Sequence, residues 1–558
     1  MNSILKHLRA ARDYQRSPMT VVAPSIPEEA DTKLDSKGGL AVEELPADGD
    51  IPVIAEAELN PGELSFEEDV AGGMGRHLGV VGRIIGTGIF STPSSILGSV
   101  GSVGASLMLW VLGFVLSFCG LCIWLEFGTM FPRSGGEKVY LEAVYKKPRH
   151  LATVIFAANA IILSSTASNC IVFAQNILVS AGHPATRWAT RGIALGVAAF
   201  VTLLHGLTPR VGVWVVNGLS ATKIAFLFFI VVTDPHANFR NAFSGSSHSA
   251  NDYATAAYKV LNAYDGWSNV NYVLNNVKDP VRTLKIAAPL GLTICSVLYL
   301  LANISYFAAA TKEEIAQSGT TVASLFVKNV FGAEAQKALT VFGMSSAVPP
   351  QGPDYSPTML MTCALCRSVI NVTFTAARVN QELAKEGIPL PFGNKFWASN
   401  WPTGKAPLRG LIIHFIPTAI IIIAPPPNVA YPFIIDVEGY PAQIISVFIV
   451  VGLFWLRWRQ PNLHRPFKVW WPMAVCFLVA ALFLLIAPFF PPANGKGDTP
   501  PLPYYLYCLV GIAVLVAGVL YWAAWRIVPR WFGYEYVSRK ETLSDGTVVT
   551  LFSRKKIE

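Results

Sequence analysis

The sequence predicts an all-α polytopic membrane protein with about twelve transmembrane helices, two of which are broken in the middle. Hydrophobic residues make up 52% of the 558 residues and charged residues only 14%, whereas soluble domains carry about 25% charged residues. Twelve apolar runs are long enough to cross a hydrocarbon layer of about 30 Å. The first and the sixth of these runs are interrupted by glycines and polar residues.

The apolar runs follow a polar N-terminal region and continue almost to the C-terminus. The loops after runs two, six, eight and ten carry clusters of Lys and Arg, so these loops and both termini should be cytosolic. The net charge of +8 then reflects membrane topology, which argues against nucleic acid as a partner. The runs cover residues 77–99, 106–131, 151–181, 188–207, 210–233, 255–275, 287–310, 357–383, 409–426, 430–456, 470–490 and 504–528.

The first run contains helix-breaking glycines, in the order Ile85, Gly86, Thr87, Gly88, Ile89. In hydrocarbon each unsatisfied backbone N–H or C=O costs several kcal/mol, so broken helices persist where protein, an ion or a ligand replaces the missing hydrogen bonds. Secondary transporters bind their substrates at such breaks. We therefore predict that these five residues bind substrate.

The sixth run is interrupted in the same way, by Ala263, Tyr264, Asp265, Gly266 and Trp267. These residues complete the predicted substrate site. Because the two breaks are five runs apart, we predict two inverted repeats of five helices, with runs eleven and twelve appended.

Two broken helices can hold a zwitterion away from water. The N–H groups of Thr87, Gly88 and Ile89 begin a half-helix, whose positive end can bind a carboxylate. Carbonyls at the end of the preceding half-helix and at Asn262 and Ala263 can accept from an ammonium group. The alternative is that the glycines merely permit close helix packing, but two breaks at corresponding positions favour a binding site.

Five motifs resemble the amino acid transporters of the amino acid, polyamine and organocation superfamily, particularly fungal members related to L-type transporters and methionine permeases. The resemblance covers most of residues 77–530. The motifs are IIGTGIFSTPSSIL (84–97), EFGTMFPRSGGEKVYLEAVY (126–145), AYDGWSNVNYV (263–273), VKDPVRTLK (277–285) and TFTAARVNQELAKEGIPLPF (373–392).

This resemblance implies the leucine-transporter-like fold of two inverted five-helix repeats and transport by alternating access. It implies that Thr87, Gly88 and neighbouring backbone hold the substrate carboxylate, and that Ala263, Tyr264 and Trp267 line the pocket or its gate. The expected function is proton-coupled transport of neutral L-amino acids, with methionine-like side chains favoured. A sodium-independent exchanger, a sodium symporter of the same fold and a non-transporting amino acid receptor are alternatives.

Lys223 lies well inside the fifth apolar run. A buried ammonium is costly and its pKa falls with desolvation, so such a residue usually has a function. In sodium-independent relatives a lysine at a similar position replaces the sodium ion near the first break. Lys223 could therefore act as a fixed cation or carry the coupling proton, and Asp265 is its natural acidic counterpart.

The sequence divides into three regions. Residues 1–72 are polar and acidic and are expected to form a disordered cytosolic tail, in which Lys33 and Lys37 are candidate ubiquitin acceptors or simply solvated. Residues 73–530 form the permease domain, and residues 531–558 a solvated cytosolic C-terminal tail. Residues 348–370, rich in proline, are an anomalous insertion before run eight, either an enlarged outer loop or a gene-model error.

Other classes of function lack support in the sequence. No nucleophile, metal cluster or paired carboxylates stand out, so we expect neither an enzyme nor a bound cofactor or metal; the proton gradient is the expected driving force. None of residues 182–191 is Cys, so a disulfide-linked partner subunit is not expected there. The expected partners are the amino acid substrate and the lipid bilayer, with the plasma membrane as the expected location.

Overall fold

The computed structural model describes residues 85–556 with gaps at 133–134, 164–165, 181–182, 208–238, 240, 269–270, 272–279, 333–368, 371, 374–375, 391, 402–406, 426, 494, 496–501 and 544–546. The predicted N-terminal tail, the fifth apolar run with Lys223, and residues 348–368 of the predicted insertion lie outside the described residues.

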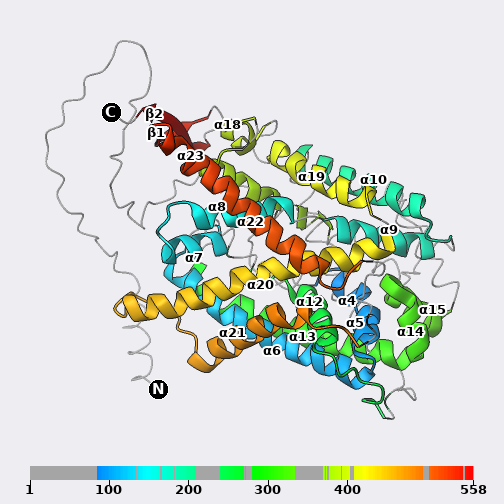
Figure 1. The fold of residues 1–558 in the computed structure, drawn as a ribbon. Coiled ribbons are helices and arrows are strands. Elements are labelled where there is room, and N and C mark those ends of the chain that lie inside the picture. The colour runs from blue at the N-terminus through cyan, green and yellow to red at the C-terminus, as the bar shows by residue number, and fades with distance from the viewer. Residues whose placement is uncertain are drawn as a thin grey trace, which may run out of the picture. The chain divides into compact units, whose positions relative to one another are not determined.

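The described chain is mostly helical (Figure 1). Helices occupy α4 (Gly88–Ser91), α5 (Pro93–Val100), α6 (Val103–Met130), α7 (Glu137–Val144), α8 (Leu151–Ile162), α9 (Ala167–Ser180), α10 (Arg187–Leu207), α12 (Ala250–Tyr264), α13 (Pro280–Ala309), α14 (Lys312–Ser318), α15 (Val322–Phe331), α18 (Asn394–Ala398), α19 (Leu408–Ile423), α20 (Pro427–Arg459), α21 (Trp471–Ile486), α22 (Leu506–Arg526) and α23 (Val528–Trp531). Short 3-10 turns lie at Gly319–Thr321 and Ala487–Phe489.

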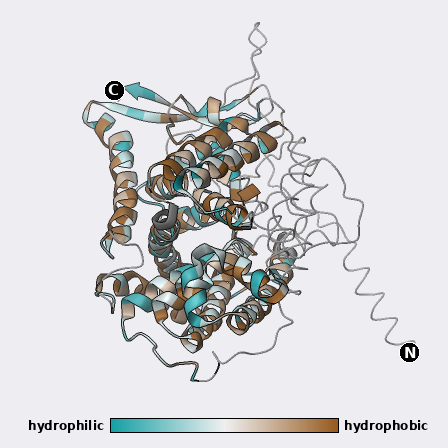
Figure 2. Cartoon of the chain, turned by 90° about the vertical axis from the view of Figure 1, so that its right-hand side faces the viewer, coloured by the Kyte–Doolittle hydropathy of each residue, from teal (hydrophilic) through white to brown (hydrophobic). Residues whose placement is uncertain are grey.

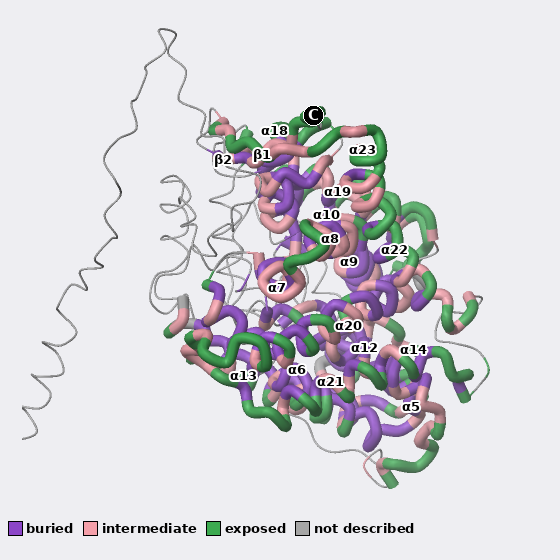
Figure 3. The backbone as a smooth tube through the Cα atoms, turned by 60° about the vertical axis from the view of Figure 1, so that its left-hand side comes forward, coloured by how far each residue is buried: buried purple, intermediate pink, exposed green. Residues whose placement is uncertain are grey.

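Seven helical segments among the described residues are long and apolar enough to cross a membrane. The helices carry many hydrophobic residues (Figure 2), and exposed residues follow the outer faces of α13 and α22 (Figure 3). On α13 the exposed side chains include Ile286, Leu290 and Val297. Apolar side chains on an outer helix face suit a lipid environment, in which the helix satisfies its own backbone groups.

The predicted runs and the observed helices coincide closely where both are described. Run two (106–131) is α6, run four (188–207) is α10, and run twelve (504–528) is α22. Run three divides into α8 and α9, and run six ends early, because α12 stops at Tyr264. The count of twelve spans and the inverted repeat stay predictions.

Local sequence explains the turn between α5 and α6. Gly101 has a φ of 76°, a left-handed conformation that ends α5, and the Ser102 hydroxyl accepts a hydrogen bond from the N–H of Ala105 to begin α6. A Cβ at Gly101 would lie 2.3 Å from the carbonyl oxygen of Gly245. Glycine is therefore required both by the backbone angle and by this close approach.

Loops that the positive-inside pattern assigns to the same side contact one another. On the predicted outer side, the Ser102 and Ser246 hydroxyls lie 2.7 Å apart. On the predicted cytosolic side, Lys285 donates to the Pro466 carbonyl at 2.8 Å, and Lys138 forms an ion pair with Glu386. The arrangement is consistent with the predicted alternation of loops.

The C-terminal segment is an exception to the all-helical prediction and to the expected solvated tail. Strands β1 (Tyr534–Thr542) and β2 (Val548–Lys556) form an antiparallel hairpin, in which Tyr534 pairs with Lys556 and Thr542 with Val548. The hairpin is largely hydrophilic (Figure 2), but Val549 is fully buried. The charged residues favoured a solvated tail, but the first half of β2 is largely apolar and is buried or half-buried.

The hairpin packs on the predicted cytosolic end of the helices. Phe552 contacts Trp525 of α22, with ring centroids 5.3 Å apart, and His150 at the start of α8, 5.6 Å away. Burial and the nearby Arg526 guanidinium lower the pKa of His150 to about 4. The imidazole that contacts the hairpin is therefore neutral at neutral pH.

Candidate functional site

In the first apolar run a helix begins at the predicted interruption, and residues 77–84 of the run lie outside the described residues. Ile85 and Gly86 precede the helix, Thr87 is its N-cap, and α4 begins at Gly88. The Ser91 hydroxyl donates to the Thr87 carbonyl at 2.9 Å, which stabilises the first turn. The positive end of α4 therefore lies at the residues that were expected to hold a carboxylate.

In the sixth run α12 ends at Tyr264, at the predicted interruption, and most of the run after Ser268 lies outside the described residues. Gly266 has a φ of 113°, which side chains other than glycine rarely tolerate. The Asp265 carboxylate accepts a hydrogen bond from the Gly266 N–H at 2.7 Å and remains exposed. The local sequence thus turns the chain out of the helix and fixes that turn.

The two breaks touch each other. A Cβ at Gly88 would lie 2.6 Å from the Cβ and 2.7 Å from the Cα of Ala263, closer than real Cβ contacts come. Only a hydrogen atom fits between these backbones. The contact brings together residues 175 positions apart in the chain, which supports a shared site rather than two unrelated helix distortions.

Tyr299 on α13 joins the two breaks, and the sequence analysis did not identify it. Its hydroxyl donates to the Ala263 carbonyl at 3.0 Å and also hydrogen-bonds to the backbone of Gly86. Tyr299 is fully buried. A tyrosine hydroxyl in an otherwise apolar run is a weak sequence signal for a binding site. Its role becomes apparent only in the structure, where both helix ends meet around it.

The predicted aromatic residues of the second break face other neighbours. Tyr264 is buried in a cluster with Trp110 and Tyr299, at centroid distances of 5.8 and 5.1 Å, and its hydroxyl donates to the Trp110 carbonyl at 3.3 Å. Trp267 packs edge-on against Trp124 of α6 at 5.4 Å. Both rings therefore lie against α6, beside the joined backbones.

Two further helices contact the first break through hydroxyl groups. Thr87 donates to the side-chain oxygen of Asn169 on α9. The Ser91 hydroxyl forms a hydrogen bond with the Tyr431 hydroxyl on α20. Ile85 and Ile89, the apolar members of the predicted site, are fully buried. Lys223, the predicted coupling residue, lies outside the described residues.

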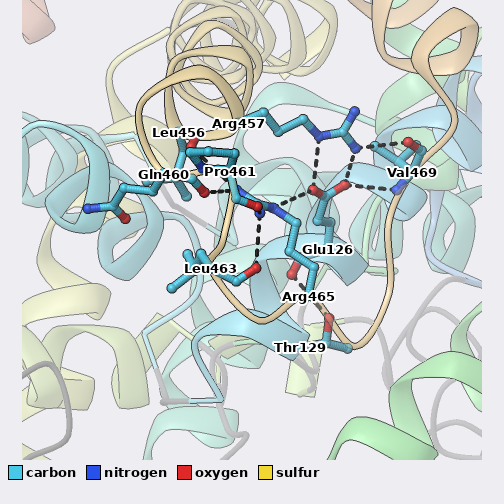
Figure 4. Close-up of polar contacts among 9 residues, drawn as sticks. All are labelled: Glu126, Thr129, Leu456, Arg457, Gln460, Pro461, Leu463, Arg465 and Val469. Carbon is cyan, nitrogen blue, oxygen red and sulfur yellow. Dashed lines mark hydrogen bonds and ion pairs between the residues drawn. The ribbon is translucent and has the colours of Figure 1, made fainter.

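A buried ion-pair cluster lies near the C-terminal end of α6, and its polar contacts are drawn in Figure 4. Glu126 is fully buried and accepts hydrogen bonds from the Arg457 guanidinium, at 3.0 Å from Nε, and from the Val469 N–H at 2.8 Å. The Arg465 Nε lies 3.6 Å from the same carboxylate. The cluster joins α6 to the end of α20 and the loop that follows it.

A second charged cluster lies near the predicted cytosolic side. Lys138 on α7 is buried and forms ion pairs with Glu142, at 3.1 Å, and with Glu386. The Thr153 hydroxyl on α8 donates to Glu142. These contacts connect α7 and α8 to the segment before α18, so two separate ion-pair clusters hold the predicted cytosolic ends of the helices together.

Several apolar helices long enough to cross a membrane, together with two glycine-containing helix ends in contact, define the class: an integral, multi-pass membrane protein of the transporter kind. The sequence model of the family described as amino acid permease matches residues 78–515. This chain belongs to the amino acid permease family and is therefore an amino acid transport protein.

Named relatives agree with this family assignment. The chain is 35% identical over 485 residues to the high-affinity methionine permease of Saccharomyces cerevisiae, covering 84% of this chain and 81% of the relative. It is 30% identical over 509 residues to the low-affinity methionine permease of the same yeast, covering 86% and 88%. It is 28% identical over 446 residues to the mouse b(0,+)-type amino acid transporter 1, covering 78% and 83%. These relatives are transporters, as opposed to enzymes.

Proposed function

We propose that this chain is a secondary active transporter that moves neutral L-amino acids by alternating access, with methionine-like side chains favoured. The contact between Gly88 and Ala263 carries the proposal, because it sets the N-terminal end of α4 beside the C-terminal end of α12. Two methionine permeases among the relatives support the substrate class.

In this proposal the backbone binds the charged groups of the substrate. The N–H groups of Thr87, Gly88 and Ile89 receive the carboxylate at the positive end of α4. The carbonyls of Asn262 and Ala263 already accept one hydrogen bond each, from the Asp265 N–H at 3.2 Å and from Tyr299 at 3.0 Å. Each carbonyl oxygen has a second lone pair, which is available to the substrate ammonium.

The remaining predicted residues have supporting roles. Ile85 and Gly86 shape the entry into the break, and Gly266 permits the turn after α12. We assign Trp267 to the gate, since it lies on the α6 side of the break, and Tyr264 to positioning through its aromatic cluster. Asp265, exposed beside the break, is available to a substrate ammonium or to Lys223.

Transport is proposed to be driven by the proton gradient, with Lys223 in place of a coupling sodium ion and no cofactor. We place the protein in the plasma membrane with both termini in the cytosol, without a disulfide-linked partner subunit. Lys33 and Lys37 in the N-terminal tail are the proposed candidates for ubiquitination.

The test is uptake of radiolabelled methionine by a permease-deficient yeast expressing this chain, at acidic and neutral pH, with unlabelled amino acids as competitors. Saturable uptake that a protonophore abolishes would support proton-driven transport. Uptake that resists the protonophore but accelerates with internal amino acid would instead establish exchange. Surface-localised protein without any amino acid uptake would contradict the transport proposal and favour the receptor alternative.

A further inference from the structure

A cavity of about 660 Å³ lies between the C-terminal hairpin and residues 387–395. Phe392 and Lys395 line it from the segment before and within α18, and Arg539, Phe552 and Arg554 line it from the hairpin. Neither the amino acid site nor the ion-pair clusters involve these cavity residues. The cavity therefore requires a separate explanation.

The cavity is rich in positive charge. Lys395 forms an ion pair with Glu541, the one carboxylate among the lining residues. Arg554 donates from Nε to the Tyr536 hydroxyl at 3.0 Å. Neither Arg539 nor Arg554 forms an ion pair with a carboxylate in the part of the chain that the structure describes. In the register of the hairpin, Arg554 shares a face with Tyr536, whereas Arg539 lies on the opposite face beside Leu551. Both line the cavity, so each guanidinium is available to an anionic ligand from its own side of the hairpin.

The cavity also adjoins the predicted cytosolic end of an apolar helix. Trp525, near the end of the apolar helix α22, is one of its lining residues. Phe392, which lines the cavity, is 86% exposed, and Trp531 and Phe532, which lie shortly before the hairpin in the sequence, are 78% and 73% exposed. Exposed aromatic rings next to the end of a membrane span are typical of the interface where lipid headgroups lie.

We propose that this cavity binds the phosphate-bearing headgroup of an anionic phospholipid. The planar guanidinium fork matches phosphate oxygens, with which it forms paired, charge-assisted hydrogen bonds. Basic residues adjoining a membrane span attract anionic lipids, and the aromatic lining suits the less polar region just below the headgroup. A bound lipid would bridge the hairpin and the segment that contains Lys395.

The experiment measures binding of a fluorescent short-chain phosphatidylinositol 4-phosphate to the full-length, detergent-purified protein. Saturable binding is expected, with competition by the unlabelled lipid and none by short-chain phosphatidylcholine. The double variant Arg539→Glu/Arg554→Glu should weaken binding about tenfold or more. Inorganic phosphate that competes as effectively as the lipid would overturn the assignment to a lipid.

The matched control is Lys540→Glu/Lys556→Glu, which makes the same change of charge on the same hairpin at residues outside the cavity. This control should retain most of the affinity. Equal losses in the two double variants would overturn the proposal, since they would indicate attraction to the hairpin charge as a whole. If the glutamate pair at the arginines prevents folding, Arg539→Gln/Arg554→Gln decides the question by the same comparison.

Discussion

The joined breaks and the predicted cytosolic end hold their parts together by different means. At the breaks, glycine, alanine and buried aromatic rings bring two backbones into contact, and Tyr299 bridges them. At the predicted cytosolic end, the buried side chains of Glu126 and Lys138 form ion pairs with residues from distant segments. These ion pairs connect distant segments through side chains instead of through direct backbone contact.

This difference suggests that one region binds the substrate and the other allows the helix ends to move. Fixed backbone dipoles suit a binding site for a zwitterion, because every amino acid presents the same two charged groups to them. Ion pairs between side chains can be separated and formed again when helix ends move, since their partners lie on different elements. If the two regions differ in this way, substitutions where the helix ends meet should chiefly impair transport, and substitutions in the ion-pair clusters should chiefly impair stability.

Replacement of Gly88 by Ala should abolish uptake. The new methyl group would lie 2.6 Å from the Cβ of Ala263, so the two breaks would have to separate, at a cost of about 1–3 kcal/mol. Gly98→Ala on α5 is the matched control, because a Cβ there has nothing within 4 Å. Methionine uptake normalised to surface protein measures both; equal uptake would refute a requirement for the contact.

Glu126→Gln should cause the largest loss of thermal stability. It would leave two arginines, Arg457 and Arg465, without their buried carboxylate, a change that typically costs about 3–5 kcal/mol. The melting temperature of the purified protein measures this loss. Glu535→Gln serves as the control, since its pair with Arg530 is exposed and exposed pairs contribute little. Similar melting temperatures for the two variants would count against a structural role for the cluster.

Tyr299→Phe should reduce uptake about tenfold while leaving the amount of surface protein unchanged. The ring remains in its aromatic cluster, but the hydrogen bonds to both breaks are lost, at roughly 1–1.5 kcal/mol. Tyr306→Phe on the same helix is the control, because the buried Tyr306 hydroxyl has no hydrogen-bond partner in the described part of the chain. An equal effect of both substitutions would exclude a specific bridging role.

The last prediction concerns the pH dependence of stability through His150. Its pKa is lowered from 6.5 to about 4 in the folded protein, so the unfolded state binds the proton more readily. Stability is then complete above about pH 6.5 and declines as the pH falls towards 4, by at most about 1.4 kcal/mol per pH unit. The charged groups acting on the imidazole are Arg526, Glu142, Lys138 and Arg149.

Melting temperatures at pH 7.5, 6.5 and 5.5 would measure this effect for the parent protein and for His150→Gln. We expect the parent protein to lose more stability on acidification than the variant, which cannot take up the proton. Identical pH profiles would show that docking of the hairpin does not depend on a neutral imidazole.

Sequence predicted the helices, the start of α4 and the end of α12 because these features are local. A run of apolar residues specifies a span, and glycine inside it specifies a break, so α6, α10 and the start of α4 lie close to their predicted positions. The contact of Gly88 with Ala263 and the bridge by Tyr299 depend on tertiary packing, which periodicity and composition do not encode.

The C-terminal hairpin was missed although the sequence contained a signal for it. Asp545 and Gly546, a pair common in hairpin turns, separate two segments with aromatic and β-branched residues. The surrounding charges favoured a solvated tail. The partners of Glu126 were also beyond sequence reasoning, because Arg457 lies 331 residues away.

Equilibrium binding of radiolabelled methionine to the purified full-length protein tests most directly whether the joined breaks form the amino acid site. The parent protein and Gly98→Ala should bind methionine saturably and with similar affinity, whereas Gly88→Ala should show no measurable binding while remaining folded. Unchanged affinity in Gly88→Ala would contradict the account, because the substrate site would then not depend on the contact between Gly88 and Ala263.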